Sequence, residues 1–340
     1  MFRTIFGHQI LICLPVILSE LAQRGHGVGC PYLSEDARPY TLSPLTILGA
    51  ELTGIDLTTT REGAQAELEE RLVKHHILSD TSRHKLLVVR GQHGLPERRM
   101  LELARWFGRL DGESYSRKHA TAPTSELTPI SNHKQYGYPV RLSWHLDGVL
   151  SNVNEAALYY TAIFPNVTVK THWIDLHEMF ESLPVPQQRR WRTIWAVWGE
   201  GEPQPLVFKR PSTNQWTVNF HSTRVKRVVV QPNSTREQWM TANERNALQR
   251  EIMAAVYRHN GTHVYSHEWK PGDLLIADNL ALAHSADAAG NASWQTIGIR
   301  LLRRVKVAGK QAPRDFVPCP VGTKRTAWHT RIIRDSNMCF

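Results

Sequence analysis

Residues 144–148 read Trp144-His145-Leu146-Asp147-Gly148. In an extended segment, side chains two residues apart point to the same side, so His145 and Asp147 can present an imidazole nitrogen and a carboxylate oxygen to one point. Two such ligands hold a divalent metal only weakly, and a third has to come from elsewhere in the chain. Because this spacing also occurs by chance, the stretch indicates a metal site only together with a partner.

A second stretch supplies that partner. Pro271 to Asn279 has the pattern of a turn, a buried strand and a polar exit, and His284 follows five residues later. Two histidines and one carboxylate on one face of a metal leave three positions open, which suits Fe(II) that must bind an oxoacid and dioxygen together. Neutral imidazoles and one carboxylate leave a net positive charge on a ferrous site, and an anionic 2-oxoacid would complete it. We interpret Asn279 as a turn residue and Trp144 as a packing residue.

A third stretch places cations at regular spacing. In Arg300-Leu301-Leu302-Arg303-Arg304, the side chains of Arg300, Leu302 and Arg304 alternate onto one face of a strand. A planar guanidinium pairs with a carboxylate through two parallel hydrogen bonds, which sets orientation as well as charge. Two such arginines next to a metal could hold two anionic groups.

The rest of the chain indicates helices first and short strands afterwards. Apolar periodicity predicts helices over 64–76, 97–107, 173–182 and 236–259. Short apolar runs predict strands, among them 86–89, 156–163, 274–276 and 297–307. This order favours one domain in which a β core carries a helical layer.

Together these motifs make the chain similar to the taurine/2,4-D dioxygenase (TauD/TfdA-like) family of Fe(II)/2-oxoglutarate enzymes. The resemblance covers residues 44–310 in order, through the segments 48–57, 86–92, 107–110, 144–147 and 269–279, followed by His284. It implies a mainly β protein with flanking helices, a double-stranded β-helix or jelly roll. It also implies a non-haem iron dioxygenase with Fe(II) as cofactor and 2-oxoglutarate as cosubstrate.

The family's site residues carry over by motif. His145, Asp147 and His284 match its metal ligands. Thr171 closes a loop from Phe164 that resembles the loop whose threonine hydrogen-bonds 2-oxoglutarate. Arg300 matches the arginine that pairs with the far carboxylate of 2-oxoglutarate. No catalytic residue beyond the metal ligands is expected.

The substrate pocket departs from the pattern of the taurine enzyme. Arg304 matches an arginine that grips the substrate anion there, but Glu113 stands at the position of a substrate-binding histidine and Arg141 at that of an asparagine. Taurine is therefore not the expected substrate. A small carboxylate-bearing or amino-acid-like molecule suits Arg304, Arg141 and Glu113 better.

The resemblance implies oxidation of an unactivated C–H bond by hydroxylation or desaturation, with release of succinate and CO2. The partners would be a small-molecule substrate and O2. Two alternatives remain open: a zinc-type metallohydrolase using the same three ligands, and a catalytically inactive scaffold of the same fold.

Composition bounds the remaining questions. The 340 residues carry a net charge of +10, but the charge is spread over short clusters with no nucleic-acid-binding motif, so we expect no nucleic-acid partner. No C-x-x-C pair occurs among the four cysteines, which argues against a zinc site or a redox dithiol built on cysteine. The oligomeric state stays open, a homo-oligomer included.

The two ends of the chain lie outside the resemblance. We expect an N-terminal extension over 1–43, for targeting or poorly ordered, the dioxygenase domain over 44–310 and a basic tail over 311–340. The apolar run from Ile10 to Leu18 is too short to span a bilayer. A cytoplasmic location is expected, although this run leaves targeting or secretion open.

Overall fold

The computed structural model describes residues 38–60, 63–112, 119–148, 154–198, 203–232 and 234–309. Most of the expected N-terminal extension, the whole of the expected tail and Glu113 therefore lie outside the described residues. Within them, no helix is long and apolar enough to cross a membrane.

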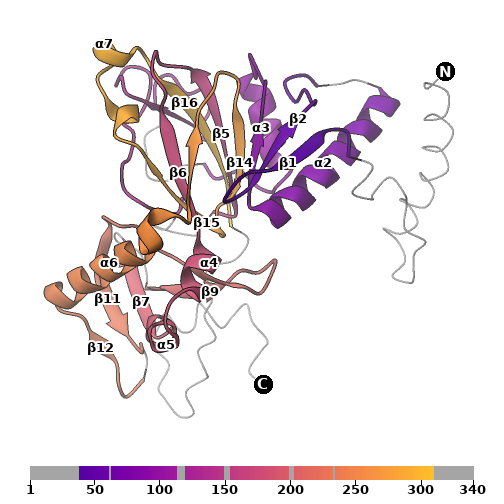
Figure 1. Ribbon diagram of the computed structural model, residues 1–340. Helices are drawn as coiled ribbons and strands as arrows, with labels where there is room; N and C mark the ends of the chain where they lie inside the picture. Colours follow the sequence, from indigo (N-terminus) through magenta and orange to yellow (C-terminus); the bar gives the residue numbers. More distant parts are fainter. Residues whose placement is uncertain are drawn as a thin grey trace, which may run out of the picture.

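The core is a pair of facing sheets, seen at the top of Figure 1. The larger has seven strands in the order β1 (Thr41–Pro44), β2 (Ala50–Thr53), β3 (Leu86–Val89), β14 (Leu274–Asp278), β5 (Ala156–Ile163), β16 (Leu301–Val307) and β4 (Leu127–Ser131). Its neighbours are antiparallel except for the β2–β3 pair. The smaller has the order β13 (Val264–Glu268), β6 (Lys170–Asp175) and β15 (Leu282–Ala286). The expected jelly-roll fold is confirmed.

Alternation along the strands explains why the large sheet is buried on both faces. In β3, Leu86 and Val88 pack between the two sheets, while Leu87 and Val89 pack on the opposite side. That opposite side is covered by α2 (Ala64–His84) and α3 (Glu97–Arg105). A strand buried on both faces has to be apolar throughout, as the run Leu86–Val89 is.

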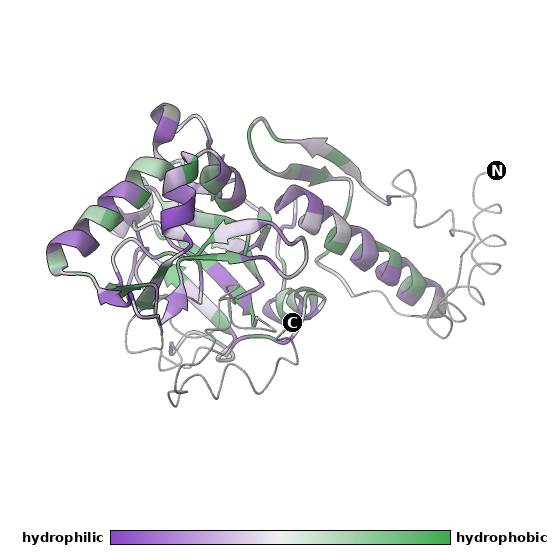
Figure 2. Ribbon diagram, turned by 90° about the horizontal axis from the view of Figure 1, so that it is seen from below, coloured by the Kyte–Doolittle hydropathy of each residue, from purple (hydrophilic) through white to green (hydrophobic). Residues whose placement is uncertain are grey.

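A second layer lies below the jelly roll in Figure 1. Two further sheets form it, β12 (Gln238–Trp239), β11 (Val225–Val230), β7 (Ile194–Trp198) and β8 (Gln204–Pro205) in one and β10 (Trp216–Val218) with β9 (Val207–Lys209) in the other. The helices of this layer are α4 (Leu176–Glu181), α5 (Val185–Trp191) and α6 (Ala242–Val256). A further helix, α7 (Trp294–Ile297), lies at the opposite end of the jelly roll. Apolar residues of α4, α6, β7 and β11 form one buried cluster here. Figure 2 shows α6 with mixed hydrophilic and hydrophobic faces, as expected of a helix that covers a core on one side.

The helix expected over 173–182 is wrong in its first part. Trp173 lies in β6, a strand held between β13 and β15, and the helix starts only at Leu176. Asp175 caps it, accepting hydrogen bonds from the backbone N–H of His177 and Glu178. Pairing on both edges of β6 outweighs the local helical periodicity, which tertiary context commonly overrides.

Two helix boundaries also differ from expectation. The helix expected over 64–76 continues to His84 and ends at Lys85, whose φ is 66°. The helix expected over 236–259 is shorter, because Gln238–Trp239 pairs with β11 and Thr241 then caps α6 with a reciprocal capping box to Glu244.

Candidate metal centre

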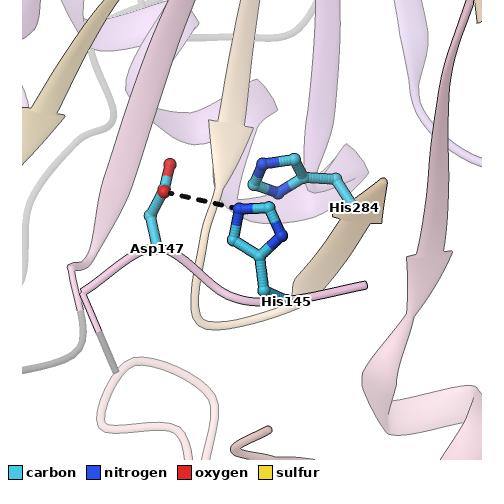
Figure 3. A group of neighbouring side chains, drawn as sticks. All are labelled: His145, Asp147 and His284. Atoms are coloured by element: carbon cyan, nitrogen blue, oxygen red, sulfur yellow. Dashed lines mark ion pairs between the residues drawn. The ribbon is translucent and has the colours of Figure 1, made fainter. Parts of the chain in front are cut away.

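Three polar side chains converge at the end of the jelly roll. One ligand atom from each of His145, Asp147 and His284 lies within 4.8 Å of the others, and all three residues are buried. In Figure 3, the histidine rings and the carboxylate point toward one another, from the segment 145–147 and from β15. Among the described residues, this is the one group of histidine, cysteine and carboxylate side chains with this geometry.

Backbone pairing explains the convergence. His145 and His284 exchange hydrogen bonds, each N–H donating to the other carbonyl at 3.0 Å. Residues opposite each other in an antiparallel pair present their side chains to the same face, so both imidazoles lie together. Asp147 joins them because it is two residues beyond His145 in the same extended segment.

Hydrogen bonds orient the first two ligands. His145 Nδ1 lies 2.6 Å from the Ser143 carbonyl and is therefore its donor, which leaves Nε2 with a lone pair, 3.9 Å from Asp147 Oδ1. Tyr159 donates to Asp147 Oδ2 at 2.8 Å, and Arg304 donates to Asp147 Oδ1 at 2.7 Å. These partners hold the carboxylate in one orientation.

Asn279 has a larger structural role than a turn residue. Its side-chain oxygen accepts from the backbone N–H of Asp147, and its amide nitrogen donates to the carbonyls of Asp147 and Asn154. Asn279 is buried and follows β14 directly. It therefore ties the metal-binding segment to the large sheet.

The protonation states suit metal binding. Burial lowers the pKa of His284 to about 3, aided by the charge on His145, and burial also lowers the pKa of His145. Burial alone would raise the pKa of Asp147, but the positive charges around it, Arg304 foremost among them, together outweigh burial and hold that pKa well below its usual range. Two neutral imidazoles and one carboxylate at neutral pH are the form in which these groups bind a divalent metal.

A cavity of about 200 Å³ opens beside the three residues. Its lining includes His145, His284, Tyr159 and the residues expected to contact ligands, namely Thr171, Arg300, Arg304 and Arg141. No aspartate or glutamate is among the described residues found in the lining itself. The cavity thus presents three arginines near one metal site, which favours anionic ligands.

Arg300 lies deep in this cavity. It is 2% exposed, and its Nη1 has no hydrogen-bond partner among the described residues. Burial lowers its pKa to about 10, opposed by the charge of Asp287, so it is a cation at neutral pH. A buried cation with an open donor fits a carboxylate of the size of 2-oxoglutarate.

The other expected ligand residues are placed as follows. Thr171 is buried in β6 at the cavity wall, and its hydroxyl accepts a hydrogen bond from Trp269 Nε1 at 2.9 Å. Arg141 is exposed at the cavity edge. Arg304 is part-buried and ion-paired with Asp147. Whether these residues and Glu113 contact ligands stays a prediction.

His221 also belongs to the surroundings of the metal site. Its ring centroid lies 5.0 Å from that of His145, and burial with the nearby charges of His145 and Arg224 lowers its pKa to about 2. The segment around it pairs with the metal-binding segment, since Ser222 N–H donates to the Trp144 carbonyl. No sequence motif points to His221.

The role of Tyr159 as a hydrogen-bond partner could have been suspected from the sequence, because a phenol in a buried strand needs a polar partner.

A jelly roll with two histidines and one carboxylate on one face of an open site defines a class of non-haem iron oxygenases. The chain matches the model of the taurine catabolism dioxygenase TauD, TfdA family over residues 38–305 and belongs to that family. The enzyme is accordingly a 2-oxoglutarate-dependent dioxygenase, which decides against the zinc-type hydrolase and the inactive scaffold.

Two relatives are similar in sequence. The (S)-phenoxypropionate/alpha-ketoglutarate-dioxygenase of Sphingobium herbicidovorans is 21% identical over 292 residues, which cover 80% of this chain and 96% of that protein. Pentalenolactone F synthase of Streptomyces arenae is 22% identical over 283 residues, covering 71% and 87% of the two chains.

Solved structures share the fold. A taurine dioxygenase from Burkholderia xenovorans superposes with a TM-score of 0.62 at 20% identity, covering 80% of this chain and 91% of that one. The structure of AAD-2 in complex with Mn(II) and N-oxalylglycine gives a TM-score of 0.62 at 16% identity, covering 81% and 99%.

One prediction concerns the support of Asp147. We expect Tyr159→Phe to weaken metal binding by about tenfold, because hydrogen-bond partners of metal ligands contribute at this scale. Fe(II) or Mn(II) titration by calorimetry measures it.

Tyr160→Phe is the matched control. Tyr160 follows on the same strand but faces the other side, where its hydroxyl accepts from the Leu95 N–H. Equal metal affinities in the two variants would show that the Tyr159 hydroxyl does not support the ligand.

Proposed function

We propose that this enzyme oxidises an unactivated C–H bond of a small, carboxylate-bearing or amino-acid-like substrate, by hydroxylation or desaturation. The observation that carries the proposal is the cavity that three arginines line beside the three metal-binding side chains. One arginine suffices for the cosubstrate, and the other two add positive charge that favours a second anion in the same cavity.

The residues present fit the cofactor and the cosubstrate. His145, Asp147 and His284 would hold Fe(II), while Arg300 would pair with the far carboxylate of 2-oxoglutarate and Thr171 would hydrogen-bond it. Once bound, iron and 2-oxoglutarate supply the oxidative chemistry: with O2 the oxoacid yields succinate and CO2, and in hydroxylation the second oxygen atom enters the substrate.

The chain's own residues position the substrate. Arg304 lies between the carboxylate of Asp147 and the cavity, so an anion held there would sit beside the metal ligands. Arg141 at the cavity edge, together with Glu113, would bind the remaining charged groups of the substrate. One relative is named for phenoxypropionate, which supports a carboxylate-bearing substrate.

The function is tested with purified protein, Fe(II), 2-oxoglutarate and a panel of carboxylates and amino acids. We expect oxygen uptake and succinate release that require 2-oxoglutarate and accelerate with at least one carboxylate. Acceleration by uncharged analogues alone would contradict the proposed substrate class, and the absence of any succinate would contradict the oxidation itself.

The predicted role of Arg304 has a separate test. We expect Arg304→Gln to raise the substrate concentration that half-saturates acceleration by about tenfold or more, because a charge-assisted hydrogen bond contributes roughly 1.5–3 kcal/mol. Succinate release as a function of substrate concentration gives the half-saturating concentration. Fe(II) titration measures how much metal affinity is lost because Asp147 no longer accepts a hydrogen bond from Arg304.

Arg303→Gln is the control, because Arg303 lies on the same strand but pairs with Glu97 on the opposite side. If Arg304→Gln changes only Fe(II) affinity and leaves the half-saturating concentration as in Arg303→Gln, Arg304 orients the ligand and does not bind the substrate.

A further inference from the structure

The cavity at the metal site is small for two organic ligands. Its volume is about 200 Å³, whereas pockets for small molecules generally measure roughly 300–1,000 Å³. With 2-oxoglutarate bound to Arg300, little of that space remains. A substrate other than a very small one has to extend out of the cavity.

A second hollow begins where the first ends. A cleft of about 700 Å³ is lined by the segment 141–144, and Arg141 lines both spaces. The cleft is bounded by that segment, by 221–224, and by Met253 and Tyr257. Trp144, which lines the cleft, directly precedes the metal-binding residue His145, so the cleft and the metal site adjoin along one segment.

The walls of this cleft are held in place. The segments 144–146 and 220–222 pair through Leu146 N–H to the Phe220 carbonyl and Ser222 N–H to the Trp144 carbonyl. Trp144 Nε1 donates to the Tyr257 hydroxyl at 2.8 Å, which ties the end of α6 to the same wall. A cleft built on paired backbone needs little rearrangement to bind a ligand.

The lining combines apolar side chains, among them Leu142, Trp144 and Met253, with groups that bind oxyanions. Two guanidinium groups, Arg141 and Arg224, lie at it, and the hydroxyl-bearing residues are Ser143, Ser222, Thr223 and Tyr257. No aspartate or glutamate is among the described residues that line it. Guanidinium forks and hydroxyl donors are the groups that bind phosphate-type oxygens.

We propose that this cleft binds the phosphate-class anionic end of an elongated substrate, whose other end reaches the metal site past Arg141. The inference rests on the proposed function and narrows its substrate class.

Arg224 is the residue to change, because it lines the cleft and not the metal-site cavity. Inorganic pyrophosphate is titrated by calorimetry into metal-free protein, with 2-oxoglutarate in excess so that Arg300 stays occupied. We expect saturable binding with a dissociation constant below about 1 mM, weakened about tenfold in Arg224→Gln and less in Arg224→Lys.

Arg189→Gln is the matched control, since it removes the same charge from an exposed position on α5. Thermal unfolding of each variant shows that it is folded. Equal affinities in Arg224→Gln and Arg189→Gln, or no saturable binding in the wild type, would overturn the site.

The elongated shape is tested with 8-carboxyoctyl phosphate, an octyl ester that ends in a carboxylate, and with methyl phosphate, on protein loaded with Fe(II) and 2-oxoglutarate. We expect the octyl ester alone to change the visible absorption of the metal site, at about tenfold higher concentration in Arg224→Gln. Saturation of the cleft without any such change would overturn the link to the metal site. Succinate release by the wild type tests the proposed function independently of both outcomes.

Discussion

Alanine at any one of His145, Asp147 and His284 is expected to abolish 2-oxoglutarate-dependent turnover. Each residue contributes one of three converging ligand atoms, and two remaining ligands cannot hold the metal in a defined geometry. Removing a residue that hydrogen-bonds a metal ligand costs about 10- to 100-fold in metal affinity or activity. Removing a ligand itself should therefore cost more than about 100-fold. Iron content and succinate release are measured together.

The control is His75→Ala, which removes an exposed histidine from α2. It should leave iron content and succinate release at the wild-type level. A triad variant that retains both would remove that residue from the metal site, and a variant that retains iron but not turnover would assign its residue to chemistry other than metal binding.

The second large effect concerns Arg300. We expect Arg300→Ala to weaken 2-oxoglutarate binding by roughly 10- to 100-fold, because a charge-assisted pair of this type contributes about 1.5–3 kcal/mol. Its burial excludes water from the pair, which favours the upper end of that range. Titration of the Mn(II)-loaded protein with N-oxalylglycine or 2-oxoglutarate measures the loss.

Arg300→Lys makes the test more specific. Lysine retains the charge but cannot form two parallel hydrogen bonds, so its affinity should lie between those of the wild type and Arg300→Ala. Metal binding should persist in both variants, because the bonds that orient His145 and Asp147 come from Ser143, Tyr159 and Arg304. An unchanged dissociation constant in Arg300→Ala would mean that another cation anchors the cosubstrate.

Much of the fold follows from local pattern. The runs Leu86–Val89 and Ala156–Ile163 are predicted as strands with the bounds that the structure has, because strands buried on both faces are rich in apolar residues over most of their length. The helix predicted over 173–182 is wrong at its start, because the pairing of Trp173 with two neighbouring strands cannot be inferred from periodicity. Where the local helical preference of a segment conflicts with strand pairing to distant segments, the tertiary structure determines which of the two forms.

Local spacing establishes which residues could form the site. The interval between His145 and Asp147 places both side chains on one side of any extended segment, and the interval between Arg300 and Arg304 does the same for the two guanidinium groups. These relations hold over a few residues and depend on backbone geometry alone. The same motifs, taken in order along 44–310, indicate the family to which the chain belongs.

How these pieces meet depends on the folded chain. The pairing of His145 with His284 joins segments far apart in the sequence, and the ion pair of Arg304 with Asp147 spans 157 residues. Asn279 holds the metal-binding segment, and His221 packs against it, through contacts of the same long-range kind. The division of the interior into a small cavity and an outer cleft also arises in this way. Each feature requires side chains from distant segments to pack together, and no local pattern encodes that arrangement.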